Sequence, residues 1–237
     1  MSRPVRICLL GGSGLVGSAV IRAAVGRNDV RLVAVARREL ALPAGARMEV
    51  LLAEPENWGD AIAAAQAEVV VSTLGTTIRR VGGDEAAFRA VDHDLVLACA
   101  RWAVEAGARQ FIAVSSVGAN QHTRNFYLRV KGETETALAK SGIGRLDLLR
   151  PGLLLGSRQE WRMGEWIARM LSPLMMLVLH GGLRRYRPIR ADTVAEAILG
   201  LAHQKARGRF VHDYDGIHRA IRRLAFERSI IAAKAVD

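Results

Sequence analysis

Short apolar runs alternate along the chain with segments whose apolar positions recur every three to four residues. The first pattern is typical of strands buried in a parallel sheet, and the second is typical of amphipathic helices. The six strands predicted in this way are Val5–Leu10, Val30–Val35, Met48–Leu52, Glu68–Thr73, Gln110–Val114 and the run from Leu146 to the stop at Pro151-Gly152. Gly208–Val211 is expected to add a last strand.

The segments between the strands predict helices. Some carry signals for their first residue, because Asn, Asp and Thr side chains accept hydrogen bonds from a helix's first turn. The expected helices are 16–25, 57–66 capped by Asn57, a long helix between Asp84 and Gly107, one that carries Tyr127 and Lys131, and Val194–His203 capped by Asp192 or Thr193. This alternation predicts an α/β fold of the Rossmann type, a doubly wound parallel sheet whose ligands lie at the carboxyl ends of the strands.

The length of 237 residues suits one domain of this kind. We expect residues 1–237 to form a single domain, with its core over 4–152 and a substrate-side region over 153–237. In that region, Trp161–Leu179 has the pattern of an amphipathic cover.

Three glycines follow the first strand directly, at 11, 14 and 17. Gly11 can adopt backbone angles closed to other residues, Gly14 lets the main chain approach a pyrophosphate, and Gly17 lets helix and strand pack closely. Phosphates then lie at the helix N-terminus, where unpaired N–H groups and the helix dipole favour an anion. The turn therefore predicts a dinucleotide site, and a glycine turn without a ligand is the alternative.

The second strand ends in Arg37-Arg38, at the place where a dinucleotide fold meets the adenosine ribose. An acidic side chain there would bind a 2′-hydroxyl, whereas two guanidinium groups suit a 2′-phosphate. These residues therefore predict NADP(H), and the alternative is a solvated basic turn. Leu74 and Gly75 follow the fourth strand and should also face the cofactor.

Ser115, Ser116, Tyr127 and Lys131 follow the fifth predicted strand. On a helix, Tyr127 and Lys131 share a face one turn apart. An ammonium near a phenol stabilises the phenolate, which a general acid/base at neutral pH requires. A Y-x-x-x-K match also arises by chance, but its position after this strand favours a catalytic role, with Ser116, or alternatively Ser115, hydrogen-bonding a substrate oxygen.

Composition limits the compartments and the partners. The formal charge is +11, and arginines are concentrated in the C-terminal third. Such a field attracts nucleotides, anionic membranes and nucleic acid without choosing among them, and no recognisable nucleic-acid module is present. Two distant cysteines, with no Cys/His spacing typical of a metal site, predict neither a disulfide framework nor a bound metal, and they favour a cytoplasmic location.

Several of these motifs together resemble the Tat-interacting-protein type of oxidoreductase within the atypical short-chain dehydrogenases/reductases. They are the glycine turn, Arg37-Arg38, Leu74-Gly75-Thr76-Thr77, Ser115-Ser116, Tyr127 to Glu133, and Arg150-Pro151-Gly152 followed by Arg158-Gln159-Glu160. The resemblance implies NADP contacts at Ser13, Gly14, Leu15, Val16, Arg37, Arg38, Leu74, Gly75, Tyr127, Lys131 and Arg158. Larger relatives add an asparagine to the proton relay, and here the matching stretch is Val91-Asp92-His93.

The expected function is NADPH-dependent hydride transfer to a carbonyl-type small molecule, with Tyr127 as proton donor and Lys131 and Ser116 as its partners. The alternative is a regulator that binds NADP(H) and reports it to a partner without turnover. A weaker expectation is peripheral contact with anionic membranes through the basic C-terminal third and Trp161–Leu179. Specific nucleic-acid binding is not expected, and the chain is expected to be a monomer or a homodimer.

Overall fold

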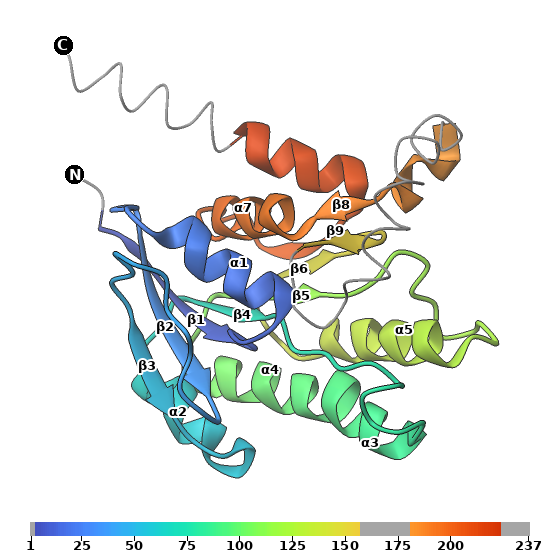
Figure 1. Cartoon of the computed structure of the whole chain (residues 1–237), viewed down its shortest axis with the longest axis horizontal. Helices are drawn as coiled ribbons and strands as arrows, with labels where there is room; N and C mark the ends of the chain where they lie inside the picture. Colours follow the sequence, from blue (N-terminus) through green and yellow to red (C-terminus); the bar gives the residue numbers. More distant parts are fainter. Residues whose placement is uncertain (1–2, 157–180, 224–237) are drawn as a thin grey trace.

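A seven-stranded sheet forms the centre of the molecule (Figure 1). The computed structural model describes residues 3–156 and 181–223, and every neighbouring strand pair in this sheet is parallel. From edge to edge the strands are β3 (Glu49–Leu52), β2 (Val30–Ala36), β1 (Val5–Leu10), β4 (Val69–Ser72), β5 (Gln110–Val114), β6 (Arg145–Leu149) and β9 (Gly208–His212). A separate parallel pair joins β7 (Leu154–Leu155) to β8 (Ile189–Arg190).

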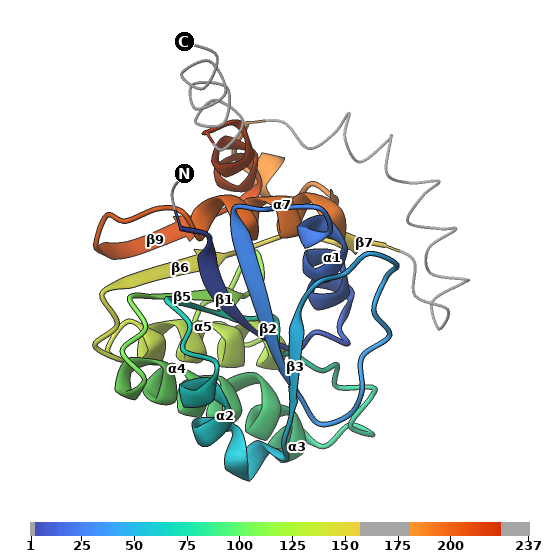
Figure 2. The same cartoon turned by 90° about the vertical axis from the view of Figure 1, so that its left-hand side faces the viewer.

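Helices cover both faces of the sheet, so the molecule has three layers (Figure 2). One face carries α1 (Leu15–Ala24), α7 (Ala191–Leu201) and a helix over residues 214–223. The other carries α2 (Trp58–Ala64), α3 (Glu85–Arg89), the π-helix η2 (Ala90–Leu95), α4 (Val96–Glu105) and α5 (Phe126–Leu138). Two short 3-10 helices, η1 (Pro55–Asn57) and η4 (Gly181–Tyr186), complete the described elements.

The strand residues divide between two cores because side chains alternate across a strand. Ile7 and Leu9 of β1 pack with α1 and α7, and Cys8 and Leu10 pack with α2, α4 and Leu138 of α5. These four side chains are fully buried, which explains why this part of β1 is apolar without alternation. Burial also raises the pKa of Cys8 to about 12, and both cysteines are free, as predicted.

The strand order reverses at β1, from which the chain builds outward first through β2 and β3 and later through β4 and β5. In a doubly wound sheet this reversal opens a crevice at the carboxyl ends of the strands. The predicted Rossmann-type fold and all seven predicted strands of the main sheet are therefore confirmed, with shifts of one or two residues at their ends.

Three details of the predicted helices are wrong. Asn57 precedes α2 but its side chain makes no capping hydrogen bond. Helix α7 begins at Ala191, earlier than predicted, and Asp192 binds Arg22 and Arg190 instead of capping it. The long helix after Asp84 is interrupted by the π-helix η2. Residue propensity predicted both caps. In the structure, Asp192 instead pairs with arginines. The predicted cover Trp161–Leu179 lies outside the described residues.

A buried carboxylate joins the three strands at one end of the sheet. Asp147 of β6 is fully buried, and it accepts hydrogen bonds from Arg145 at 2.6 and 2.8 Å and from Gln110 at 2.8 Å. His212 of β9 contacts the same carboxylate at 2.8 Å. Burial alone would raise the pKa of Asp147, but the hydrogen bonds from His212, Arg145 and Gln110 outweigh burial and hold this pKa below its usual range.

The lowered pKa of Asp147 predicts an acid-sensitive fold. Its carboxylate stabilises the folded state above the ordinary aspartate pKa, and this contribution is lost as the pH falls through the lower folded-state pKa. Asp147→Asn leaves Arg145 buried without its counter-charge, so it should lower the free energy of unfolding by about 3–5 kcal/mol at neutral pH. It should also flatten the acid dependence of that free energy, which urea unfolding followed by tryptophan fluorescence would measure.

Asp192→Asn is the matched control for this measurement. The Asp192 side chain is 51% exposed in its ion pair with Arg22, so its removal should cost less than about 1 kcal/mol. Equal losses in the two variants would show that the Asp147 cluster contributes no more than a surface pair.

Candidate functional site

The turn between β1 and α1 has the geometry that its glycines predicted. Gly11 has a φ of 82°, and a Cβ atom on it would lie 2.9 Å from the backbone of Thr73. A Cβ atom on Gly17 would lie 2.2 Å from the Gly11 carbonyl oxygen, so only glycine fits there. Gly14 is the N-cap of α1 and supplies no side-chain cap, which leaves the first turn open to a ligand. This cradle suits a pyrophosphate.

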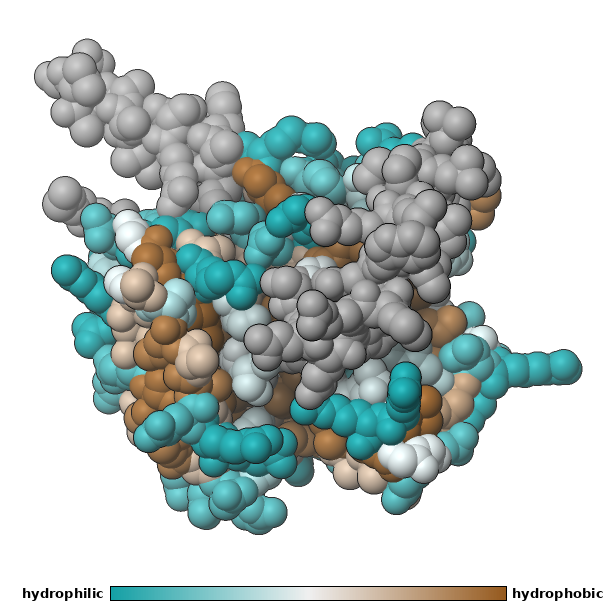
Figure 3. Space-filling view, viewed as in Figure 1, coloured by the Kyte–Doolittle hydropathy of each residue, from teal (hydrophilic) through white to brown (hydrophobic). Residues whose placement is uncertain are grey.

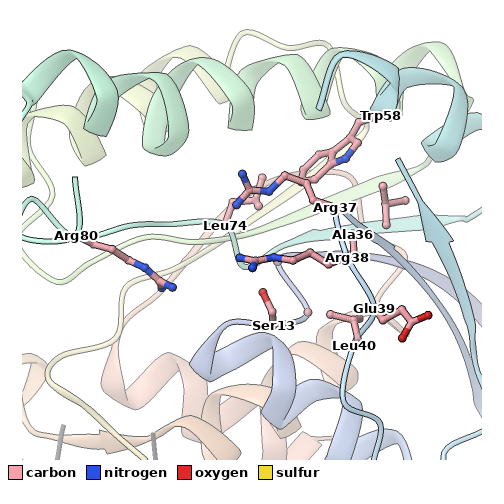
Figure 4. A pocket seen from close by; sticks show the side chains of 12 residues that line it. Ser13, Ala36, Arg37, Arg38, Glu39, Leu40, Trp58, Leu74 and Arg80 are labelled. Carbon is pink, nitrogen blue, oxygen red and sulfur yellow. The ribbon is translucent and has the colours of Figure 1, made fainter. Parts of the chain in front are cut away.

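A pocket of about 520 Å³ lies beside this turn, at the carboxyl ends of β1 and β2 (Figure 4). It brings together the predicted residues Gly11, Ser13, Arg37, Arg38 and Leu74. The other lining residues are Gly12, Val35, Ala36, Glu39, Leu40, Trp58 and Arg80. Figure 3 shows that apolar and hydrophilic side chains lie next to each other on the surface in front of β2.

Arg80 is a pocket residue that the sequence did not reveal. It lies in the loop after β4, and its guanidinium points toward Arg38 and Ser13 (Figure 4). Arg79 and Arg80 are adjacent in this loop, and only the path of the loop decides which of the two reaches the pocket. No sequence signal distinguishes the two.

Three guanidinium groups therefore meet in one pocket without carboxylate partners. Within the described ranges, Arg37, Arg38 and Arg80 form no ion pair, and the Glu39 carboxylate points away from them (Figure 4). Repulsion between like charges raises the free energy of the folded state unless an anion neutralises them. Such a cluster of guanidinium groups can bind an anionic group.

Helix α5 carries the predicted Tyr127 and Lys131. Its N-cap Asn125 accepts a hydrogen bond from the Leu128 N–H at 3.0 Å, which fixes the start of the helix. Tyr127 is 38% exposed, and its ring packs edge-on against Phe88 at 5.8 Å between ring centres. Among the described residues, the Tyr127 hydroxyl has no hydrogen-bond partner, so it is available to a ligand.

Lys131 is buried, and its Nζ lies 2.8 Å from Oδ1 of Asp92. Gly75 adjoins this pair, because a Cβ on Gly75 would lie 3.3 Å from Asp92 Oδ1 and 3.8 Å from Lys131 Nζ. The loop after β4 thus touches both parts of the site: Leu74 lines the arginine pocket and Gly75 lies against Lys131.

The two candidate serines differ in their surroundings. The Ser115 hydroxyl donates a 2.6 Å hydrogen bond to Glu135, which is buried and also binds Arg150. Ser116 is half-buried, and its hydroxyl has a longer 3.3 Å contact with the Val117 carbonyl oxygen. Ser115 is therefore engaged in holding α5 against the end of β5, and Ser116 is the better placed of the two to bind a substrate oxygen.

The structure also bears on the predicted Arg158 contact, on metal binding and on membrane spans. Arg158, predicted to bind the cofactor, lies outside the described residues. Over residues 3–156 and 181–223, no cluster of His, Cys, Asp or Glu has the arrangement of a metal site. None of the helices in the same ranges is both long and apolar enough to cross a membrane.

Comparison with known proteins places these features in a family context. The model of a family described as NAD(P)H-binding matches residues 11–160. The mitochondrial protein fmp52 of Aspergillus niger is 31% identical over 81% of this chain and 84% of its own. FMP52 of Eremothecium gossypii is 34% identical over 82% and 87% of the two chains. The protein HTATIP2 of Rattus norvegicus is 36% identical over 69% and 68%.

Solved structures show the same fold at low sequence identity. MoeE5 in complex with UDP-glucose and NAD has a TM-score of 0.65 at 16% identity, over 87% of this chain and 74% of its own. A putative NAD-dependent epimerase/dehydratase from Bacillus halodurans has a TM-score of 0.64 at 22% identity, over 87% and 92%. These likenesses support the Rossmann-type architecture.

The predicted cytoplasmic location is wrong by the same comparison. The fungal FMP52 relatives are named as mitochondrial proteins. The error has a physical reason, because two buried thiols show only that no disulfide is needed and do not distinguish one reducing compartment from another.

Proposed function

This chain belongs to the NAD(P)H-binding family, as one of the atypical short-chain dehydrogenases/reductases, and we propose that it is an NADPH-dependent oxidoreductase acting on a small carbonyl compound. The observation that carries the proposal is the loop after β4. Leu74 of this loop lines the arginine pocket and Gly75 adjoins Lys131. A dinucleotide that binds along the loop would have its adenosine end at the arginines and its nicotinamide end near Lys131 and Tyr127.

The residues present fit this cofactor. The Gly11 and Gly17 positions leave no room for a Cβ, as a backbone cradle for a pyrophosphate requires. Arg37, Arg38 and Arg80 supply the fork-shaped donors that a 2′-phosphate binds, and the carboxylate of Glu39, which also lines the pocket, points away from them (Figure 4). NADP(H) is therefore the proposed form of the cofactor.

When bound, the cofactor supplies the hydride that reduces the carbonyl carbon. Tyr127 then gives its phenolic proton to the alkoxide oxygen, and Ser116 hydrogen-bonds the same oxygen. Lys131 holds a positive charge on the same helix face as Tyr127. Solvent can return the proton to Tyr127, because this side chain is partly exposed.

A sensor without turnover would need the arginine pocket but not the Tyr127 and Lys131 pair, so the pair favours the enzyme. Contact with anionic membranes stays a prediction, as do the monomeric or homodimeric state and the lack of specific nucleic-acid binding.

Arg80→Ala should weaken NADPH binding selectively. Loss of one charge-assisted hydrogen bond costs about 1.5–3 kcal/mol, or roughly 10- to 150-fold in affinity. NADH, which has no 2′-phosphate, should lose little. Calorimetric titration of both cofactors measures the effect, and Arg37→Ala should behave in the same way.

Arg79→Ala is the matched control, because it removes the same charge from the neighbouring residue, which does not line the pocket. Equal affinity of the unmodified protein for NADPH and NADH would refute the assignment of the 2′-phosphate to these arginines.

Tyr127→Phe should lower turnover by about 10²–10⁴, the usual contribution of a positioned proton donor, with little change in NADPH affinity. NADPH consumption against ketones, aldehydes, quinones and enones would first identify a substrate and then measure the loss. Tyr214→Phe removes the same hydroxyl from the helix over residues 214–223 and should leave turnover unchanged. Undiminished turnover in Tyr127→Phe would exclude Tyr127 as the proton source.

A further inference from the structure

The last strand of the main sheet, β9, has an open edge. Within the described part of the chain it pairs with β6 alone, and Figure 2 shows it at the outside of the sheet. The Gly208 N–H and the His212 carbonyl oxygen bond toward β6, so alternate residues of β9 face that strand. The backbone N–H and C=O groups of Arg209 and Val211 therefore point toward the open edge, where another strand can bind them.

A groove of about 990 Å³ adjoins this edge, and both β9 and the helix over residues 214–223 line it. Phe210 and Val211 of the strand contribute to one wall, and Ala220 of the helix contributes to the other. Val211 is 45% exposed and Phe210 is half-buried. At an exposed sheet edge, an extended peptide gains affinity from main-chain hydrogen bonds, and adjoining pockets select its side chains. The groove and the edge together supply both features.

The groove is positively charged. Four exposed basic residues line it, which are Lys205, Arg209, Arg219 and Arg223. Of the lining residues in the described ranges, none is acidic. Arg209 lies 3.8 Å from Glu135, beyond hydrogen-bond distance, and Arg150 already binds that carboxylate. Charge complementarity therefore favours a partner with carboxylate side chains.

Contacts on the inner side of β9 hold the strand in place. His212 contacts the buried Asp147 carboxylate at 2.8 Å, and the Arg145 guanidinium lies 4.1 Å from the centre of the Phe210 ring. Arg145 also binds Asp147 and donates a 2.9 Å hydrogen bond to the Ala206 carbonyl oxygen. A strand that is already ordered loses little conformational entropy when a partner binds to it.

A second copy of this chain fits the same edge poorly. Two β9 strands side by side would bring Arg209 and the nearby Lys205 and Arg207 close to the same residues of the other copy. Like charges on adjacent strands repel, and basic residues at a sheet edge prevent such self-pairing. A segment rich in Asp and Glu has the opposite charge and does not meet this repulsion.

We propose that β9 and the helix over residues 214–223 form a docking site for an acidic segment of another protein, which adds to the sheet as a strand beside β9. The backbone groups of Arg209 and Val211 bond to the backbone of this segment, and the basic side chains of the groove meet its carboxylates. The groove and the arginine pocket have no lining residue in common among those described. The inference therefore does not depend on the proposed function.

The test is fluorescence anisotropy with a labelled peptide, Glu-Val-Glu-Val-Glu-Val-Glu, which is acidic and favours an extended conformation. A second peptide of the same sequence is N-methylated at every internal amide, so it keeps the charge but cannot donate to a neighbouring strand. Val211→Pro removes an N–H from the open edge and leaves the bonds between β9 and β6 intact. Arg219→Glu reverses one charge of the groove.

Arg101→Glu is the matched control, because it makes the same charge change at an exposed residue of α4, outside the lining of the groove. The unmodified protein should bind the first peptide at least about 10-fold more tightly than the methylated one, because main-chain bonds supply much of the affinity. Val211→Pro and Arg219→Glu should each weaken binding of the first peptide by about 10-fold. Arg101→Glu should change it by less than about twofold.

Equal binding of the two peptides would overturn the proposal, because the peptide would then bind by charge without adding a strand. A failure of the unmodified protein to bind the first peptide at low salt would also overturn it. So would a loss in Arg101→Glu as large as that in Arg219→Glu. The comparison of the two peptides uses the unmodified protein, so it decides the question even if Val211→Pro fails to fold.

Discussion

The site depends on the close approach of two backbone turns, one after β1 and one after β4. The Thr73 hydroxyl lies 2.8 Å from the carbonyl oxygen of Leu10 and 3.1 Å from that of Gly11, so its one proton is shared between them and ties the two turns together. No side chain fits between them at Gly11. Because parallel strands end at the same edge of the sheet, this contact sets the distance between the phosphate cradle and the loop that leads to Lys131.

Buried carboxylates hold the elements around this contact in place. Asp92 joins the π-helix to α5 and to the loop after β4. Glu135 joins α5 to β6, and Asp147 joins β5, β6 and β9. Each is buried, and each has a basic partner, as burial of a charge requires. Two of the three lie on or against α5, so the helix that presents Tyr127 is restrained along its length.

The charge of the molecule has a local meaning in this structure. A net charge of +11 attracts many kinds of anion, but the three arginines of the pocket come from two loops that only folding brings together. These three arginines lie beside the glycine turn, so part of the positive charge of the chain is concentrated at one pocket. The remaining basic residues do not define a ligand by charge alone.

The fold and the glycine turn after β1 could be predicted from the chain alone. Apolar runs predicted the strands, because a buried strand needs apolar residues at neighbouring positions. Glycine spacing predicted the turn between β1 and α1, because its backbone angles require glycine at fixed positions. Helical spacing alone also predicted that Tyr127 and Lys131 share one face of a helix.

The other features of the site come from contacts between segments that are distant in the chain. Arg80 reaches the pocket through the path of a loop, Ser115 is engaged by Glu135 from α5, and Asp92 meets Lys131 from another helix 39 positions earlier in the chain. The cap expected at Asp192 failed for the same reason, because Asp192 instead binds Arg22 from a distant helix. Such contacts between distant segments depend on distances that no local pattern encodes.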